Sequence, residues 1–338
     1  MSTSVAAGPP QALLEIEHLR VEFGAQVAVN DVSTVVGRSE VVGLVGESGS
    51  GKSLTCRAAV RLIPPGGRIS AGQVRFDGRE VLGLSKQELR QLRAHDVGMI
   101  FQDPFSSLNP TLSVGRQLSE TLRLNAGLTT AGARERAVEL LEQVEIPDPE
   151  ARLRVYPHEL SGGQRQRVMI ALAIAASPKL LIADEATTAL DVSTQAQVLA
   201  LIKRLRRERD MSVLLVSHDF AVVAEMCDRV VVVYGGFVLE TGALREVYTA
   251  PAHPYTRALL DAVPVLHTRP GVRRRGIPGP ALGTVPYTGG CPFLPRCAFA
   301  GAECASVPMS LQPVGATQAT ACPVVSSTDL RRTGAGAI

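Results

Sequence analysis

The sequence predicts an α/β fold, because short apolar segments typical of buried strands alternate along the chain with segments typical of helices. The first of these, residues 41–45, is a continuous apolar run that ends at Gly46, as a buried parallel strand would. Strands are expected at residues 41–45, 97–101, 180–183, 213–216 and 230–234, and helices at residues 52–63 and 198–209. At 338 residues, the chain is long enough for one large domain and an accessory segment.

Three segments depart from this alternation. Residues 12–23 alternate apolar and polar side chains, which suits an early antiparallel strand. Residues 104–164 contain expected helices at 114–125 and 131–144 and no strong strand candidate, which indicates an inserted helical subdomain. Beyond about residue 265, Pro and Gly become frequent and four of the six cysteines appear. We therefore expect a disordered leader at 1–11, a main domain at 12–264, and a C-terminal module at 265–338 with a flexible end.

Composition excludes several classes of protein. Apolar residues make up 45% and charged residues 20%, which is ordinary for a soluble globular chain. The net charge of +3, the absence of Trp and the 4% content of aromatic residues argue against a nucleic-acid partner read by base stacking. No apolar run approaches the roughly 18 residues of a membrane span, and the N-terminus lacks the features of a signal peptide. We expect a cytoplasmic protein, and docking on a membrane partner stays open.

Residues 46–53 predict a phosphate-binding loop. They fit the pattern G-x-x-x-x-G-K-[ST] and lie between an expected strand and an expected helix. Such glycines allow backbone N–H groups to surround phosphate oxygens, and the following helix N-terminus adds positive potential. Lys52 is expected to reach the β- and γ-phosphates, and Ser53 to hold Mg²⁺. The loop consists of Gly46, Glu47, Ser48, Gly49, Ser50, Gly51, Lys52 and Ser53.

Two further segments suggest what happens to the bound nucleotide. Residues 180–185 read as an apolar strand that ends in Asp184 and Glu185. Asp184 can coordinate Mg²⁺ through water and Glu185 can polarise an attacking water, although two acids at a strand end are often only the start of a solvated loop. The segment Leu160-Ser161-Gly162-Gly163-Gln164 is a second glycine-rich turn that opens a helix. A nucleotide held from two sides usually needs two copies of such a domain.

Six short motifs, taken in order, resemble those of the ATP-binding cassette (ABC) ATPases. They are Gly46–Ser53, Gln102 in Phe101-Gln102-Asp103, Leu160–Gln164, Asp184-Glu185, Ala189-Leu190-Asp191 and His218 in Ser217-His218-Asp219. The match covers about residues 12–250 and implies a P-loop NTPase (RecA-like) core, with an antiparallel β subdomain and an inserted helical subdomain. It also implies ATP and Mg²⁺ as ligands. One departure is Ala186, where Pro often follows the acidic pair, and it removes no chemical group.

The resemblance implies a role for each matching position. Glu185, Gln102 and His218 would be the catalytic residues, and Ser53, Gln102 and Asp184 would contact Mg²⁺. Ser161, Gly162, Gly163 and Gln164 would cap the γ-phosphate bound to the opposite subunit, and Asp191 would cross the dimer interface. Phe23 would stack on adenine. Structural alternatives remain open: Asp191 as a helix N-cap, His218 as a structural residue and Phe23 as part of the core.

Other segments resemble one branch of this family, the oligopeptide/dipeptide (peptide/nickel) importer ATPases. They are His253–Leu260, Phe101–Pro104, Ser107–Pro110 and Tyr156–Glu159, and with the later cysteines they extend the match to about residue 325. The form Ile182–Glu185 is more similar to the first (D-type) of the paired ATPases in that branch.

This resemblance implies an ATPase subunit at the cytoplasmic face of the membrane that energises import of oligopeptides or dipeptides. Its implied partners are a second, paralogous ABC ATPase, two transmembrane permease subunits and an extracytoplasmic substrate-binding protein, with no nucleic acid. Nickel complexes or sugars are alternative cargoes of the same machinery. A non-transport ABC ATPase is disfavoured because the chain has one cassette and no coiled-coil insertion. A P-loop kinase would leave Leu160–Gln164 unexplained.

Four cysteines lie in the expected C-terminal module: Cys291, Cys297, Cys304 and Cys322, with gaps of five, six and seventeen residues. Disulfides are not expected in a cytoplasmic ATPase, and no C-x-x-C pair favours a zinc ribbon. Relatives in the importer branch carry such a tail, so the resemblance implies a four-iron four-sulfur cluster on these residues, with zinc or free thiols as alternatives. Cys56 and Cys227 suit buried helix positions. The basic run Arg273–Arg275 reads as solvated.

Overall fold

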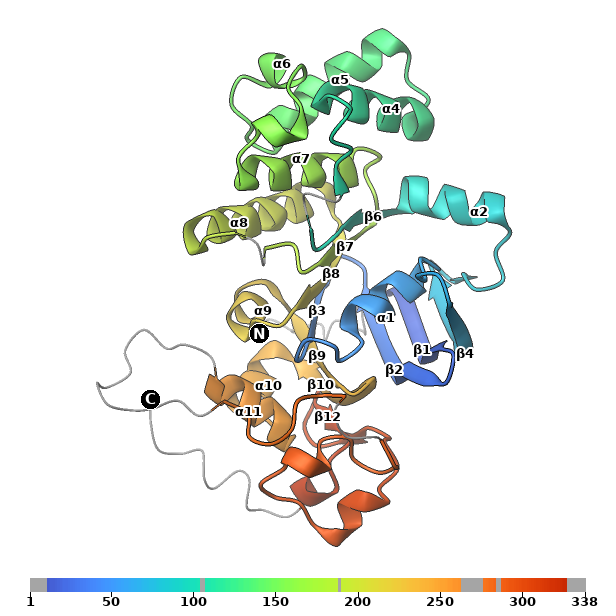
Figure 1. The fold of residues 1–338 in the computed structure, drawn as a ribbon, viewed down its shortest axis with the longest axis vertical. Coiled ribbons are helices and arrows are strands. Elements are labelled where there is room, and N and C mark those ends of the chain that lie inside the picture. Colours follow the sequence, from blue (N-terminus) through green and yellow to red (C-terminus); the bar gives the residue numbers. More distant parts are fainter. Residues whose placement is uncertain (1–10, 104–106, 188–189, 263–275, 284–286, 327–338) are drawn as a thin grey trace, which may run out of the picture. The chain divides into compact units, whose positions relative to one another are not determined.

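The computed structural model describes residues 11–103, 107–187, 190–262, 276–283 and 287–326 (Figure 1). The chain divides into two compact units. Unit 1 comprises Met1–Leu14, Val35–Glu40 and Arg75–Leu214, and unit 2 comprises Glu15–Thr34, Val41–Val74 and Leu215–Ile338. Strands β1 (Ala12–Phe23), β2 (Gln26–Gly37), β4 (Gly67–Phe76) and β8 (Ser212–Ser217) contribute residues to both units. The predicted leader, apart from residue 11, lies outside the described residues, as do the run Arg273–Arg275 and residues 327–338, where the chain was expected to end flexibly.

Unit 1 combines parallel strands with a group of helices. Its elements are β5 (Arg79–Glu80), α2 (Lys86–Gln91), a π-helical turn (Leu92–Asp96), β6 (Val97–Ile100), α4 (Val114–Ala126), α5 (Thr130–Gln143), α6 (Pro149–Arg152), a 3₁₀ turn (Pro157–Glu159), α7 (Gly162–Ile174), β7 (Leu180–Asp184) and α8 (Val192–Arg209). Strands β6 and β7 pair in parallel, from Val97 opposite Leu180 to Ile100 opposite Ala183. Helix α7 packs directly on β6, since a Cβ on Gly98 would lie 2.2 Å from the Ala173 carbonyl oxygen.

Helices α4 to α7 of unit 1 contact one another as one group (Figure 1). The buried side chains of α4 and α5 are mostly Leu and Ala, among them Leu118, Leu122, Ala137, Leu140 and Leu141. This spacing places the apolar side chains on the inner faces of α4 and α5. No strand is found from residue 107 to residue 179, a fully described stretch, which agrees with the expected run of helices. The bounds of a helical subdomain at 104–164 stay a prediction.

Unit 2 is built on the strands β3, β9 and β10. Its elements are β3 (Val41–Val45), α1 (Lys52–Ala59), α9 (Phe220–Met226), β9 (Arg229–Tyr234), β10 (Phe237–Ala243), α10 (Leu244–Thr249), α11 (Pro254–Ala262), β11 (Gln312–Pro313), β12 (Ala319–Thr320) and 3₁₀ turns at Leu294–Arg296, Ala302–Ala305 and Pro323–Ser326. Strand β3 pairs with β9 in parallel, from Val42 opposite Arg229 to Val45 opposite Val232. Strand β10 pairs antiparallel with both β9 and β12.

The parallel pairs β6–β7 and β3–β9, with helices between their strands along the chain, confirm the predicted α/β class. Helix α1 is shorter than expected, because the chain leaves the helix at Val60 and Arg61 takes a left-handed φ of 54°. Helix α8 is longer than expected, because the side chain of Asp191 caps it six residues earlier than predicted. Strand β10, which follows the two-residue Gly235-Gly236 turn, was not predicted. Among the helices described, none has both the length and the apolar character that crossing a membrane requires.

Candidate nucleotide-binding and catalytic residues

The predicted residues fall into two groups, one in each unit. Unit 2 holds Phe23, the loop Gly46–Ser53 and His218, and unit 1 holds Gln102, Leu160–Gln164, Asp184, Glu185 and Asp191. Each group is described within its own unit.

The phosphate loop of unit 2 joins β3 to α1, as the sequence pattern predicts. Lys52 begins α1, and only 3% of the residue is exposed. Its Nζ donates to the carbonyl oxygens of Gly46 and Glu47, both at 2.7 Å, and lies 3.3 Å from Ser50 Oγ. All these acceptors belong to the loop itself. The ammonium group is therefore held inside the loop, where it can exchange carbonyl partners for phosphate oxygens.

Gly46 is required by the close packing of the loop on β9. Its φ is +157°, and a Cβ there would lie 2.1 Å from the carbonyl oxygen of Val233. At the other end of the loop, a Cβ on Gly51 would lie 2.8 Å from the carbonyl oxygen of Ala28 in β2. Backbone on both sides thus fixes the path of the loop.

Glu47 connects the phosphate loop to residues far along the chain. Its backbone N–H donates to the hydroxyl of Tyr255 in α11 at 2.7 Å. Its carboxylate accepts two hydrogen bonds from Arg296, at 2.6 and 3.0 Å, and Arg296 also donates to the hydroxyl of Tyr234 at 3.2 Å. The Glu47 carboxylate raises the pKa of Arg296 above its ordinary value. The sequence predicted neither contact to Glu47. Tyr255 lies in the segment His253–Leu260, which was used only to assign the branch of the family, and Arg296 matched no motif.

Tyr255 and Tyr234 belong to a buried aromatic cluster in unit 2. The ring centroids of the two tyrosines lie 4.6 Å apart, and Phe293 lies 5.3 Å from Tyr234 and 5.1 Å from Tyr255. Phe293 is 2% exposed and Tyr255 is fully buried. Tilted and edge-on contacts of this kind each contribute about 1 kcal/mol beyond area burial. The support behind the phosphate loop is therefore a packed core and not a solvated turn.

Phe23 and His218 complete the predicted group in unit 2. Phe23 ends β1 and is partly exposed, and a Cβ on Gly67 would lie 2.7 Å from its ring. The ring tip is therefore packed against Gly67. His218 is exposed in the turn after β8, where the next residue, Asp219, caps α9 by accepting from the Ala221 N–H at 2.8 Å.

In unit 1 the structure brings Gln102 and Glu185 together. The Gln102 Nε2 donates to Glu185 Oε2 at 2.7 Å, across 83 residues of sequence. Asp184 is the last residue of β7 and is fully buried. Glu185 has a left-handed φ of 50°, which is uncommon for a non-glycine residue and is often found at functional sites. The geometry places an exposed amide beside the carboxylate expected to act as the base.

The Leu160–Gln164 turn starts α7 with a reciprocal pair of hydrogen bonds. Ser161 Oγ accepts from the Gln164 N–H at 3.3 Å, and Gln164 Oε1 accepts from the Ser161 N–H at 3.1 Å. This capping box satisfies two backbone donors at the helix N-terminus. Ser161 is exposed, and its hydroxyl proton can still be donated to a ligand.

Asp191 is the N-cap of α8, which was one of the two roles considered for it from the sequence. Its two carboxylate oxygens accept from the Thr194 N–H at 2.9 Å and the Thr194 hydroxyl at 2.7 Å. These bonds, the backbone one first, hold the pKa of Asp191 below its ordinary value. A Cβ on Gly163 would lie 2.7 Å from Thr194 Cγ2, so the glycine-rich turn and the start of α8 are adjacent. Ala189, from the motif around Asp191, lies outside the described residues.

The residues expected to contact Mg²⁺ fit that ion chemically. Ser53 supplies a hydroxyl, Asp184 a carboxylate and Gln102 an amide oxygen, and Mg²⁺ prefers oxygen ligands. Because the Gln102 nitrogen donates to Glu185, the amide oxygen is the atom left for a metal.

The predicted iron–sulfur cluster is wrong. Within the described ranges, no group of three or more His, Cys, Asp or Glu side chains is arranged to hold a metal ion. Burial raises the pKa of Cys291 to about 12 and also raises that of Cys297. Cys291, Cys297, Cys304 and Cys322 are all free cysteines. The spacing of the cysteines in the sequence could not show how their side chains are arranged in space.

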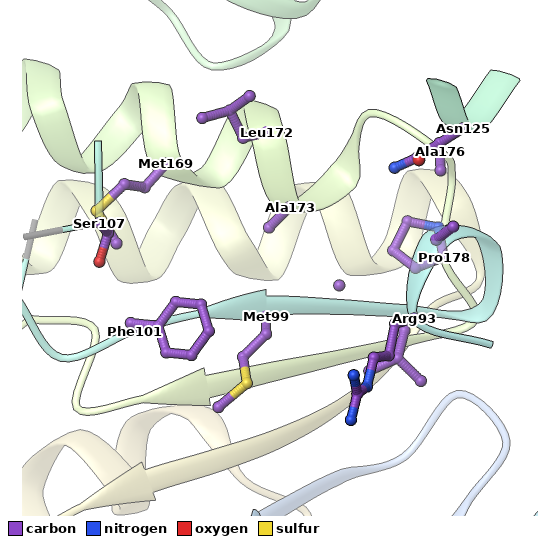
Figure 2. A pocket seen from close by; sticks show the side chains of 13 residues that line it. Arg93, Met99, Phe101, Ser107, Asn125, Met169, Leu172, Ala173, Ala176 and Pro178 are labelled. Atoms are coloured by element: carbon purple, nitrogen blue, oxygen red, sulfur yellow. The ribbon is translucent and has the colours of Figure 1, made fainter. Parts of the chain in front are cut away.

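A pocket of about 210 Å³ lies in unit 1 beside the Gln102 segment. Figure 2 shows Met99 and Phe101 on the side of β6, with Met169 and Ala173 of α7 across from them. Arg93, Ser107 and Asn125 supply polar groups to the lining. Phe101 directly precedes Gln102, so a molecule in this pocket would lie one residue from the group that contacts Glu185.

The fold and the phosphate loop define a P-loop nucleoside triphosphatase. Residues 29–188 match the family model described as ABC transporter, and residues 239–304 match the oligopeptide/dipeptide transporter, C-terminal region. The oligopeptide transport ATP-binding protein OppD of Salmonella typhimurium is 47% identical over 307 residues, covering 90% of this chain and 91% of the relative. The dipeptide transport ATP-binding protein DppD of Escherichia coli is 46% identical over 297 residues, covering 87% and 90%.

Solved structures of ATP-binding cassettes are similar to this chain in fold. The dimeric post-hydrolysis state of the ATP-binding cassette MJ0796 with ADP and Pi has a TM-score of 0.61 at 28% identity, covering 69% of this chain and 99% of that chain. CbiO1 of Clostridium perfringens, part of the transporter complex cbiONQ, has a TM-score of 0.62 at 28% identity, covering 70% and 91%. The chain belongs to the ATPases of the ABC transporter family, in the oligopeptide/dipeptide transporter branch.

Proposed function

We propose that this protein binds and hydrolyses ATP and so energises import of oligopeptides or dipeptides through partner membrane subunits. The observation that carries the proposal is the union, in one chain, of an ABC transporter region with the C-terminal region of oligopeptide/dipeptide transporters. The names of two relatives, an oligopeptide and a dipeptide transport ATP-binding protein, support this cargo class over nickel complexes or sugars.

Binding of ATP would use the phosphate loop as the structure holds it. Lys52 would exchange its bonds to the Gly46 and Glu47 carbonyls for bonds to the β- and γ-phosphates. The backbone N–H groups of Ser48, Gly49, Ser50 and Gly51 would surround the phosphate oxygens. Mg²⁺, held by Ser53, Gln102 and Asp184, would supply charge neutralisation on the phosphates. Phe23 would stack on adenine.

Hydrolysis would depend on the pair Gln102 and Glu185. The Glu185 carboxylate would accept a proton from water as the water oxygen bonds to the γ-phosphorus and the bond from phosphorus to the bridging oxygen of ADP breaks. Gln102, already hydrogen-bonded to Glu185, would orient that carboxylate and the water. His218 would hold the γ-phosphate in line for the attack.

A second ABC ATPase, a paralogue of this chain, would complete the nucleotide site. Ser161, Gly162, Gly163 and Gln164 would cap the γ-phosphate bound to that partner, and Asp191 would reach across the interface. The exposed Ser161 hydroxyl supports this role, since an exposed helix N-terminus is a ready anion site. The related cassette solved with ADP and Pi is a dimer.

Two transmembrane permease subunits would dock on unit 1, at the cytoplasmic face of the membrane. The pocket between β6 and α7 would receive a cytoplasmic segment of a permease, and its movement would reach Glu185 through Phe101 and Gln102. An extracytoplasmic protein would bind the peptide and deliver it. The proposed layout is an ABC domain at 12–264 with an antiparallel β subdomain and a helical subdomain at 104–164, followed by a C-terminal module at 265–338.

Substitution Glu185→Gln tests the hydrolytic role. In the complex with its membrane partners, we expect turnover to fall at least about 100-fold, because the amide cannot accept the proton, while ATP binding is retained. Phosphate release and equilibrium ATP binding would be measured on the same preparation. The matched control is Glu208→Gln, which alters an exposed carboxylate in α8 that pairs with its helix neighbour Arg204. Normal turnover in the Glu185 variant would reject the proposed base.

A further inference from the structure

The contact between Arg296 and Glu47 joins the expected C-terminal module to the phosphate loop. The two residues are separated by 249 positions, and their side chains make a two-pronged ion pair at 2.6 and 3.0 Å. The Arg296 side chain is 6% exposed and that of Glu47 is 26% exposed. An ion pair this well shielded is screened much less by salt than a surface pair.

Every N–H group of the Arg296 guanidinium has an acceptor. Besides the two Glu47 oxygens, these are the Tyr234 hydroxyl at 3.2 Å and the carbonyl oxygens of Ile277 at 3.2 Å and Pro278 at 2.9 Å. The guanidinium carbon also lies 5.9 Å from the ring centroid of Tyr234. The side chain therefore has one well-defined position, set by three separate segments of unit 2.

Glu47 places a negative charge in a loop built to bind a polyanion. The Lys52 ammonium, which is expected to meet the phosphates, contacts the Glu47 carbonyl at 2.7 Å. A carboxylate on that same residue would repel phosphate if its charge were not cancelled. Arg296 supplies the compensating positive charge, and the two N–H groups at the end of its planar guanidinium match the two oxygens of the Glu47 carboxylate.

We propose that Arg296 is a positioning residue for nucleotide binding. Its guanidinium neutralises the Glu47 carboxylate and keeps the phosphate loop in a conformation that can accept phosphate. Nucleotide affinity therefore depends on the C-terminal segment that carries Arg296. The identity of the ligand as ATP or ADP rests on the proposed function. The ion pair of Arg296 with Glu47 and its burial are observations that do not depend on that function.

A charge-compensation cycle tests this role. The full chain would be prepared as Arg296→Met, Glu47→Gln and the double variant, and binding of MgADP and of a non-hydrolysable ATP analogue would be measured by calorimetry. We expect Arg296→Met to weaken binding about tenfold, the order of effect of one uncompensated charge at a partly exposed site. Adding Glu47→Gln should restore affinity to within about threefold of the unsubstituted chain, because the repelling charge is gone.

Two further variants separate charge from packing. Arg296→Lys keeps the positive charge but cannot make the two-pronged ion pair with Glu47. This variant should still bind nucleotide better than Arg296→Met. The matched control pair is Arg116→Met and Glu120→Gln, which removes an exposed ion pair within α4 and should leave affinity unchanged. Thermal midpoints of all variants would show that each is folded.

The outcomes distinguish the inference from the proposed function. If the double variant binds as weakly as Arg296→Met, the pair is only a structural support and charge compensation is overturned. Unchanged affinity in Arg296→Met also overturns the inference. If the unsubstituted chain binds neither nucleotide, the proposed function itself fails.

Discussion

The phosphate loop and the Leu160–Gln164 turn both open a helix, but the structure supports them in different ways. The loop is held by residues far away in sequence, including Val233, Tyr255 and Arg296. The hydrogen bonds that start the turn, by contrast, are local: Ser161 and Gln164 cap each other.

This difference fits two different tasks. A loop that must hold its own ligand gains from a rigid, pre-arranged backbone, because less conformational freedom is lost on binding. A turn that is to meet another molecule must stay exposed, so local caps are the supports that leave its surface accessible. Substitutions in the loop should therefore act on distant core contacts, and substitutions in the turn should act only on α7 and its neighbour α8.

The largest expected effect comes from Gly46→Ala. Its Cβ would lie 2.1 Å from the Val233 carbonyl, a backbone atom that cannot move without shifting β9. We expect loss of measurable nucleotide binding and destabilisation by about 3 kcal/mol, the upper range for overpacking. The matched control is Gly49→Ala, which meets no atom within 4 Å and carries only the strain of φ +81°.

Gly49→Ala should cost only about 1 kcal/mol of unfolding free energy. Urea unfolding followed by Tyr fluorescence suits both variants, since the chain has five Tyr and no Trp. Equal destabilisation by the two substitutions would show that the loop is not fixed by β9.

The parts of this comparison that sequence could predict are the local ones. The loop pattern at 46–53 and the helix start after Leu160 are properties of consecutive residues, and the structure shows a strand, a loop and a helix where they were expected. The Gln102–Glu185 contact spans 83 residues, and only a resemblance to known proteins pointed to a shared role.

The distant supports could not be predicted, for a physical reason. Tyr255 and Arg296 reach Glu47 across 208 and 249 residues, and such contacts depend on how β9, α11 and the C-terminal segment pack. The cluster prediction for the four cysteines was wrong for the same reason: sequence spacing does not say whether packing brings the side chains together, and within the described residues no group of them is arranged to hold a metal ion. Patterns predict elements, whereas the charges and contacts between elements come from packing.

A smaller effect is expected from Gly163→Ala in the turn. The new Cβ would lie 2.7 Å from Thr194 Cγ2, and Thr194 cannot turn away without breaking its hydroxyl bond to Asp191. We expect a loss of about 2 kcal/mol, typical of overpacking, measured by thermal unfolding. Gly162→Ala is the matched control, because its Cβ would make only an ordinary contact, 3.7 Å from Leu190.

A second substitution sharpens the Gly163 prediction. Thr194→Ser removes the methyl group but keeps the hydroxyl, so the variant Gly163→Ala, Thr194→Ser should recover most of the lost stability. Recovery would confirm that the clash is confined to α7 and α8. A double variant no more stable than Gly163→Ala would mean that the turn, like the loop, depends on contacts elsewhere.

The smallest effect expected is a dependence of unit 2 on pH through His253. Burial lowers the pKa of this fully enclosed histidine to about 3, and its Nδ1 accepts from the Tyr255 N–H at 3.0 Å. Below pH 6.5 the unfolded chain binds a proton that the folded chain does not, so stability falls as pH falls. Between pH 6.5 and 5.5 the unsubstituted chain should lose about 1 kcal/mol more than His253→Asn, whose amide oxygen can replace Nδ1 as acceptor. Urea unfolding at the two pH values measures the difference in unfolding free energy. Equal losses of stability in the two proteins would show that the packed core behind the phosphate loop does not depend on a neutral His253.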